Sequence, residues 1–131
     1  MHSPSSNLHS NVEDMARWAL ANLNRGELEG TRILREQTYE IMWKPTRKLD
    51  DGDSVGISWF LGEYRGHKTV SHSGGDTGYS TYLIMLPEKK LAVVLMANCD
   101  WLGAGRAQIA HAALDVALGL KPQSTTVTPA P

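Results

Sequence analysis

The sequence has few of the features that would set a protein apart from ordinary globular chains. One cysteine, Cys99, stands among 131 residues, so no intrachain disulfide can form and the redox compartment stays open. No apolar run approaches the roughly 20 residues of a transmembrane helix. The first residues, Met-His-Ser-Pro-Ser-Ser, lack the apolar core of a signal peptide. A formal net charge of −1 gives no electrostatic reason to expect a nucleic acid or an anionic membrane as a partner.

What remains is a globular composition, with 41% hydrophobic and 21% charged residues. The length fits one domain or part of one. We assign residues 1–120 to the folded part, with an irregular lead-in over residues 1–9. Residues 121–131 are rich in Pro, Thr and Ser and have little to bury, so they are predicted to be a disordered tail or a linker.

Three helices are predicted. Ser10 and Glu13 fit a capping box, and apolar residues at helical spacing continue to Leu23, so this helix should end near residues 24–26. A shorter helix is expected over residues 33–43, stopped by Pro45. The third is expected over residues 104–118, where Gly119 ends it.

Four strands are predicted, over residues 54–64, 68–73, 79–86 and 91–97. The first alternates apolar and polar residues, and the last is continuously apolar, which is typical of a strand covered on both faces. Short connections between them favour an antiparallel meander. The fold class is therefore α+β, with an antiparallel sheet of three to four strands flanked by helices.

The strand over residues 68–73 leads into His72-Ser73-Gly74-Gly75, where the two glycines predict a bend and a close approach of another molecule. Taken alone, this short pattern is more often an ordinary turn with a polar histidine. The other histidines, His2, His9, His67 and His111, have no metal-ligand spacing and are interpreted as surface groups.

The order of segments resembles the C-terminal part of the serine β-lactamase and penicillin-binding-protein family. The likeness is greatest to class C β-lactamases, family VIII esterases and D-amino-peptidase-like members. Their third catalytic motif is Lys-Thr-Gly or His-x-Gly, which His72-Ser73-Gly74 matches. Gly78-Tyr79, the Leu-Pro-Glu-Lys-Lys end of one strand and the Ala-Asn end of the next also fit, and the resemblance extends over about residues 10–120.

The resemblance implies a role for each motif residue in the attack of a serine on an acyl carbon. His72 stands where the family often has lysine and would steady proton transfer around the nucleophile. Ser73 would offer its hydroxyl to a substrate carboxylate or amide, and Gly74 would let the substrate approach. The Gly75 N–H would be one oxyanion-hole donor. The resemblance implies a small-molecule acyl substrate and no cofactor.

Two other family motifs are missing from this sequence. No serine has lysine three residues later, and no tyrosine is followed by x-Asn. We therefore expect the C-terminal portion of a serine hydrolase, inactive by itself. The alternative is a free-standing, non-catalytic module that uses the sheet for binding or assembly. A nucleophile-bearing segment upstream in the gene would favour the first hypothesis. The substrate, whether lactam, ester, D-peptide or amide, stays open.

The predicted sheet should also have an unpaired edge, which invites pairing with another chain. We therefore predict a homo-oligomer, or complementation by a missing N-terminal segment.

Overall fold

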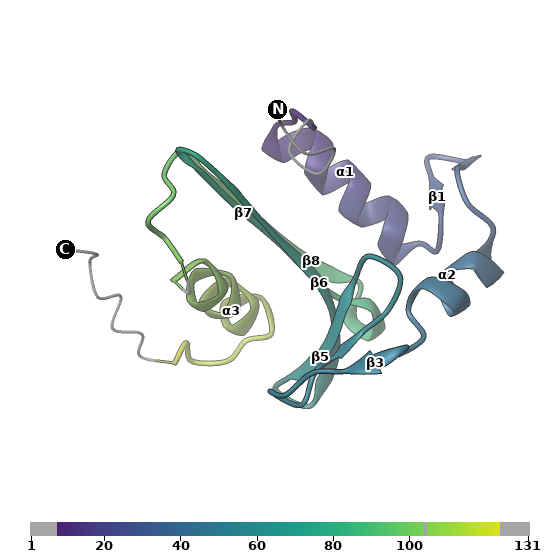
Figure 1. The fold of residues 1–131 in the computed structure, drawn as a ribbon. Coiled ribbons are helices and arrows are strands. Elements are labelled where there is room, and N and C mark those ends of the chain that lie inside the picture. Colours follow the sequence, from purple (N-terminus) through teal and green to yellow (C-terminus); the bar gives the residue numbers. More distant parts are fainter. Residues whose placement is uncertain (1–7, 104, 124–131) are drawn as a thin grey trace.

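The computed structural model describes residues 8–103 and 105–123 and shows helices on both faces of one sheet (Figure 1). The helices are α1 (Val12–Leu23), α2 (Glu36–Met42) and α3 (Gly105–Ala117). A small hairpin is formed by β1 (Glu27–Leu28) and β2 (Thr31–Arg32). The main sheet is antiparallel and follows chain order, with strands β3 (Arg47–Lys48), β4 (Ser54–Val55), β5 (Phe60–Tyr64), β6 (His67–Asp76), β7 (Tyr79–Leu86) and β8 (Leu91–Ala97).

The α+β class is confirmed, but the main sheet has six strands rather than three or four, because the two-residue strands β3 and β4 extend it. The strand predicted over residues 54–64 is broken into β4 and β5. A Cβ on Gly56 would lie 2.2 Å from the Met42 carbonyl oxygen, so the backbone here passes directly against the end of α2. The bend that follows includes Ser58 at φ 62° and leaves Ile57 exposed instead of facing the core.

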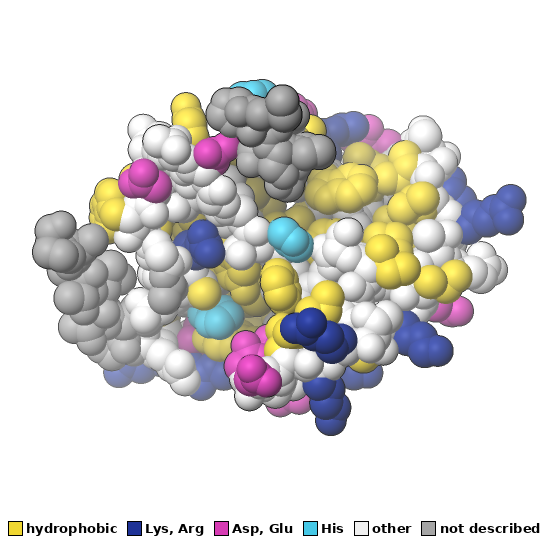
Figure 2. Space-filling model, viewed as in Figure 1, with side chains coloured by type: hydrophobic (Ala, Val, Ile, Leu, Met, Phe, Trp, Pro, Cys, Tyr) yellow, Lys and Arg dark blue, Asp and Glu magenta, His cyan; other side chains and the backbone are white. Residues whose placement is uncertain are grey.

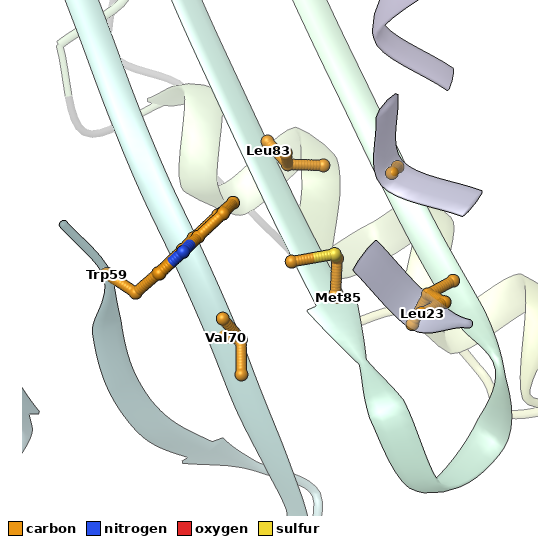
Figure 3. Packing of buried hydrophobic residues seen from close by; sticks show 6 residues of the cluster. Leu23, Trp59, Val70, Leu83 and Met85 are labelled. Carbon is orange, nitrogen blue, oxygen red and sulfur yellow. The ribbon is translucent and has the colours of Figure 1, made fainter. Parts of the chain in front are cut away.

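Two hydrophobic clusters hold α1 and α3 to opposite faces of the sheet. Figure 3 shows the first, where Leu23 of α1 points toward Met85 and Leu83 of β7, with Val70 and Trp59 beside them. The second cluster joins β7 to α3 through four buried residues: Ile84, Leu86, Ala110 and Leu114. Both helices also contact β8, yet this strand stays half-buried rather than buried, because it is the last strand of the sheet.

The start of α1 and the end of β6 each lie at a different residue from the one predicted. Helix α1 is capped by Asn11, whose side-chain oxygen accepts the Asp14 N–H at 2.9 Å, so the predicted Ser10 cap was one residue early. Strand β6 does not bend at Gly74-Gly75 but continues to Asp76, and the turn comes at residues 77–78, where Gly78 has φ 80°. The predicted bend was wrong because these glycines still pair with β7.

The turn between β5 and β6 is tied to α3 by an ion pair and a ring stack. Arg65 donates two hydrogen bonds to the buried Asp115 carboxylate, at 2.9 and 3.1 Å. This contact holds the pKa of Asp115 below its usual value. The His111 ring stacks on Tyr64 with centroids 4.1 Å apart, and burial lowers the pKa of His111. The prediction that His111 is a surface group was therefore wrong.

Of the predicted tail, residues 121–123 have no regular structure, although the Gln123 N–H donates to Asp115 at 3.2 Å. Residues 124–131 and 1–7 lie outside the described residues. Within the described part of the chain, no helix combines the length and apolar character that crossing a membrane requires.

Candidate active site

The four residues predicted to form the site lie in the last part of β6, where the sheet is paired on one side only. Strand β5 pairs with β6 as far as Ser71, while β7 pairs with it through Asp76. Among the described residues, residues 72–76 therefore have a strand on one side and an unpaired edge on the other. Because successive residues of a strand direct their N–H groups to alternate sides, part of this backbone is free to bind another molecule.

Register divides the motif side chains between the two faces of the sheet. His72 is opposite Leu83, which belongs to the cluster under α1, and Ser73 is opposite Tyr82, which packs with the cluster under α3. Since paired residues share a face, His72 lies on the α1 face and Ser73 on the α3 face. The His72 side chain is exposed, with its ring 5.5 Å from that of Phe60.

The two glycines differ in what surrounds them. A Cβ on Gly74 would lie 2.4 Å from the Thr81 hydroxyl oxygen, so this position is closed by its cross-strand neighbour. A Cβ on Gly75 would meet nothing nearer than 3.8 Å, namely Arg106 Nη1 and the Tyr79 carbonyl oxygen. Gly74 is thus explained by internal packing, whereas Gly75 leaves room for another molecule.

A groove of about 920 Å³ opens at this end of the sheet. Its walls are residues 8–12 at the start of α1, residues 74–77, and the facing parts of β7 and β8, including Thr81 and Met96. Gly74 and Gly75 line it, while His72 and Ser73 do not. His72 nevertheless shares a face with Gly74, because alternate residues of a strand point the same way.

Two other kinds of site find no support in the geometry. Within residues 8–103 and 105–123, no group of three or more His, Cys, Asp or Glu side chains is placed to hold a metal ion. Gly52-Asp53-Ser54-Val55-Gly56 matches the Gly-x-Ser-x-Gly pattern of a nucleophile elbow. A nucleophile elbow requires a strand, a sharp turn and a helix. Ser54 instead lies in a short antiparallel strand that leads through a bend to β5.

The fold defines the class of protein, a scaffold of the β-lactamase and penicillin-binding-protein type. The Beta-lactamase family model matches residues 1–118, and the chain belongs to this family.

Two relatives show how much of the family's length the chain represents. It is 30% identical over 110 residues to an unguisins hydrolase of Aspergillus campestris (strain IBT 28561), covering 78% of this chain and 20% of that protein. Its structure is similar to the octameric penicillin-binding protein homologue from Pyrococcus abyssi, with a TM-score of 0.76 and 29% identity over 86% of this chain and 25% of that one. The chain thus spans about a quarter or less of either relative.

Proposed function

We propose that this chain supplies the oxyanion-binding strand of an acyl-transfer hydrolase whose nucleophile is provided by another segment. The observation that carries the proposal is the unpaired edge of β6 at Gly75, beside a groove, in a chain of the Beta-lactamase family. Neither Ser-x-x-Lys nor Tyr-x-Asn occurs in residues 1–131, so the proposal assigns the nucleophile and its base to the other segment.

In the proposed reaction, a serine oxygen from that other segment attacks the acyl carbon of a substrate lying in the groove. The carbonyl electron pair moves to oxygen, and the Gly75 N–H donates a hydrogen bond to the resulting oxyanion. In this proposal His72, which shares a face of β6 with Gly74, assists proton transfer around the nucleophile. Ser73 lies on the α3 face of the sheet, opposite to the face of the groove. Its proposed hydroxyl contact therefore needs a substrate that extends around the unpaired edge of β6.

The proposed substrate is an amide, an ester or a lactam. The curated relative is named as a hydrolase of unguisins. A groove bounded by Thr81, Met96 and the backbone of residues 74–77 offers both polar and apolar contacts to such a substrate.

The test compares variants of a protein in which this chain is joined to a nucleophile-bearing segment. Gly75→Pro removes the proposed donor, and Gly75→Ala keeps it with room for the methyl group. Proline is tolerated at a sheet edge where its missing N–H faces away from the ladder. We expect the proline variant to lose about 100- to 1000-fold in kcat and the alanine variant to lose little.

His72→Ala and His72→Lys give a second comparison that does not disturb the backbone. Loss of turnover in the alanine variant and its recovery with lysine would support the assigned role, because the family often has lysine there. The chain alone should hydrolyse neither nitrocefin nor p-nitrophenyl esters above background. Equal turnover in all four variants, or a serine of residues 1–131 labelled stoichiometrically by a fluorophosphonate, would refute the proposal.

We also propose that the chain associates through its sheet. Strand β8 is an end strand of the sheet, and the described surface exposes large hydrophobic side chains, including Trp18 and Leu20 of α1 and Ile41 of α2. Figure 2 shows such side chains lying open in the middle of one face and over the end that carries β1 and α2. A second copy, or the nucleophile-bearing segment, would cover them.

A further inference from the structure

The backbone at Gly74-Gly75 has little of its own to hold it in place. Two adjacent glycines have the greatest conformational freedom of any dipeptide. Strand β5 no longer pairs with β6 beyond Ser71, so of the strands in residues 8–103 and 105–123 only β7 fixes this segment within the sheet. A donor that stabilises an oxyanion is effective only when it is oriented before the charge develops. A contact from outside the sheet would therefore restrict this peptide further.

The first turn of α3 and the connection that precedes it each contact the segment at one point. Arg106 Nη1 donates a hydrogen bond to the Gly74 carbonyl oxygen at 3.2 Å. The Asp100 carboxylate accepts the Gly78 N–H at 3.2 Å, in the turn that follows β6. The glycine pair and its turn are thus held from the side of α3 as well as by β7.

The arginine is itself held by its helix. Arg106 lies in the first turn of α3 and is half-buried. The preceding Gly105 is buried and donates its N–H to the Leu102 carbonyl oxygen at 2.7 Å. The helix packs on the sheet through Ala110 and Leu114. Within the described part of the chain Arg106 forms no ion pair, so no carboxylate there draws its guanidinium away from Gly74.

The peptide plane connects this contact to the proposed chemistry. The Gly74 carbonyl and the Gly75 N–H belong to one planar group, and none of the described peptide bonds is cis, so the two point in opposite directions. A hydrogen bond that fixes the carbonyl therefore also fixes the direction of the N–H. A charged donor on the carbonyl also polarises the amide, which strengthens the N–H as a donor.

We infer that Arg106 is a positioning residue that orients the Gly75 N–H by holding the Gly74 carbonyl from the opposite side. Its catalytic meaning rests on the proposed function, but the restraint on the backbone does not. Arg106→Met removes the donor and keeps much of the apolar stem, whereas Arg106→Lys keeps a cationic donor. Arg17→Met is the matched control, since Arg17 pairs with Glu29 at an exposed site on α1.

The first readout is the ¹⁵N order parameter of Gly75 in the 131-residue chain. We expect an order parameter of about 0.85 in the parent chain and a fall to below about 0.6 in Arg106→Met. Arg106→Lys and Arg17→Met should keep the order parameter of the parent chain. The β7 amides report whether the sheet is intact. An unchanged Gly75 order parameter in Arg106→Met, with the sheet intact, would overturn the inference.

The second readout is turnover of the chain joined to its nucleophile-bearing segment. Arg106→Met should lower kcat about 10- to 100-fold with KM little changed, and Arg106→Lys should restore part of it. If Gly75→Pro lowers kcat but Arg106→Met does not, the positioning role fails and the proposed function survives. If neither variant changes kcat, the proposed function fails, and the order parameter alone decides the role of Arg106.

Discussion

At the scale of single residues, the two glycines of the motif turn out to have different reasons for being glycine. From the sequence, both glycines are predicted to let another molecule approach the backbone. The structure gives Gly74 a cross-strand neighbour, Thr81, that fills the space of a side chain, and leaves the space beside Gly75 open. Cross-strand register decides this difference, and no local pattern reveals it.

The two positions should therefore respond oppositely to alanine. Gly74→Ala forces its methyl group against the Thr81 hydroxyl and should lower the free energy of unfolding by about 1–3 kcal/mol. Gly75→Ala should be neutral or stabilise by up to about 1 kcal/mol, because it restricts the unfolded chain. Urea denaturation measures both. Thr81→Ala combined with Gly74→Ala should recover much of the loss, and failure to do so would contradict the assigned clash.

His111 should make stability depend on pH. Burial against Tyr64 lowers its pKa in the folded chain, although the Asp115 carboxylate opposes that shift. As pH falls below the ordinary histidine value of about 6.5, the unfolded chain binds a proton before the folded chain does. The stability present above that pH is therefore lost on acidification.

The measurement is the free energy of unfolding from pH 8 to pH 5, for the parent chain and for His111→Phe. The phenylalanine keeps a ring on Tyr64 and removes the titration, so it should flatten the decline over this range. The pKa of Asp115 is lowered by its hydrogen bonds from Arg65, and its own contribution should be lost only below about pH 4. An equal decline in both proteins would show that His111 is not responsible.

At the scale of elements, local signals identified the three helices and the β7 and β8 strands, because periodicity and turn residues are visible in a short window. The β4–β5 break was missed, since it depends on the approach of Gly56 to the Met42 carbonyl. The continuation of β6 through Gly74-Gly75 was missed because pairing with β7 outweighs the weak preference of glycine for strands. The four motif residues were predicted through the family pattern, and their roles stay predictions, whereas Arg106 gave no signal, being 32 residues from its partner.

At the scale of the whole molecule, the open edge of the sheet predicts association. Sedimentation equilibrium over a wide concentration range should show species heavier than 14.4 kDa, because an uncovered edge strand and exposed apolar side chains favour pairing. A substitution of β8 such as Met96→Lys, on a partly exposed side chain of that strand, should shift the equilibrium toward monomer. A folded monomer at all concentrations that binds no hydrophobic dye would contradict this prediction.

The chain-order sheet also has a consequence for how the protein folds. Strands β5 to β8 pair only with their sequence neighbours, so each hairpin closes a short loop at small entropic cost. Helix α1 must instead reach β7 and β8, and the hydrogen bond from Lys90 to the Leu23 carbonyl joins residues 67 positions apart. Low contact order within the meander and high contact order at α1 favour early hairpins and a late-docking helix, an order that pulsed hydrogen exchange during refolding would resolve.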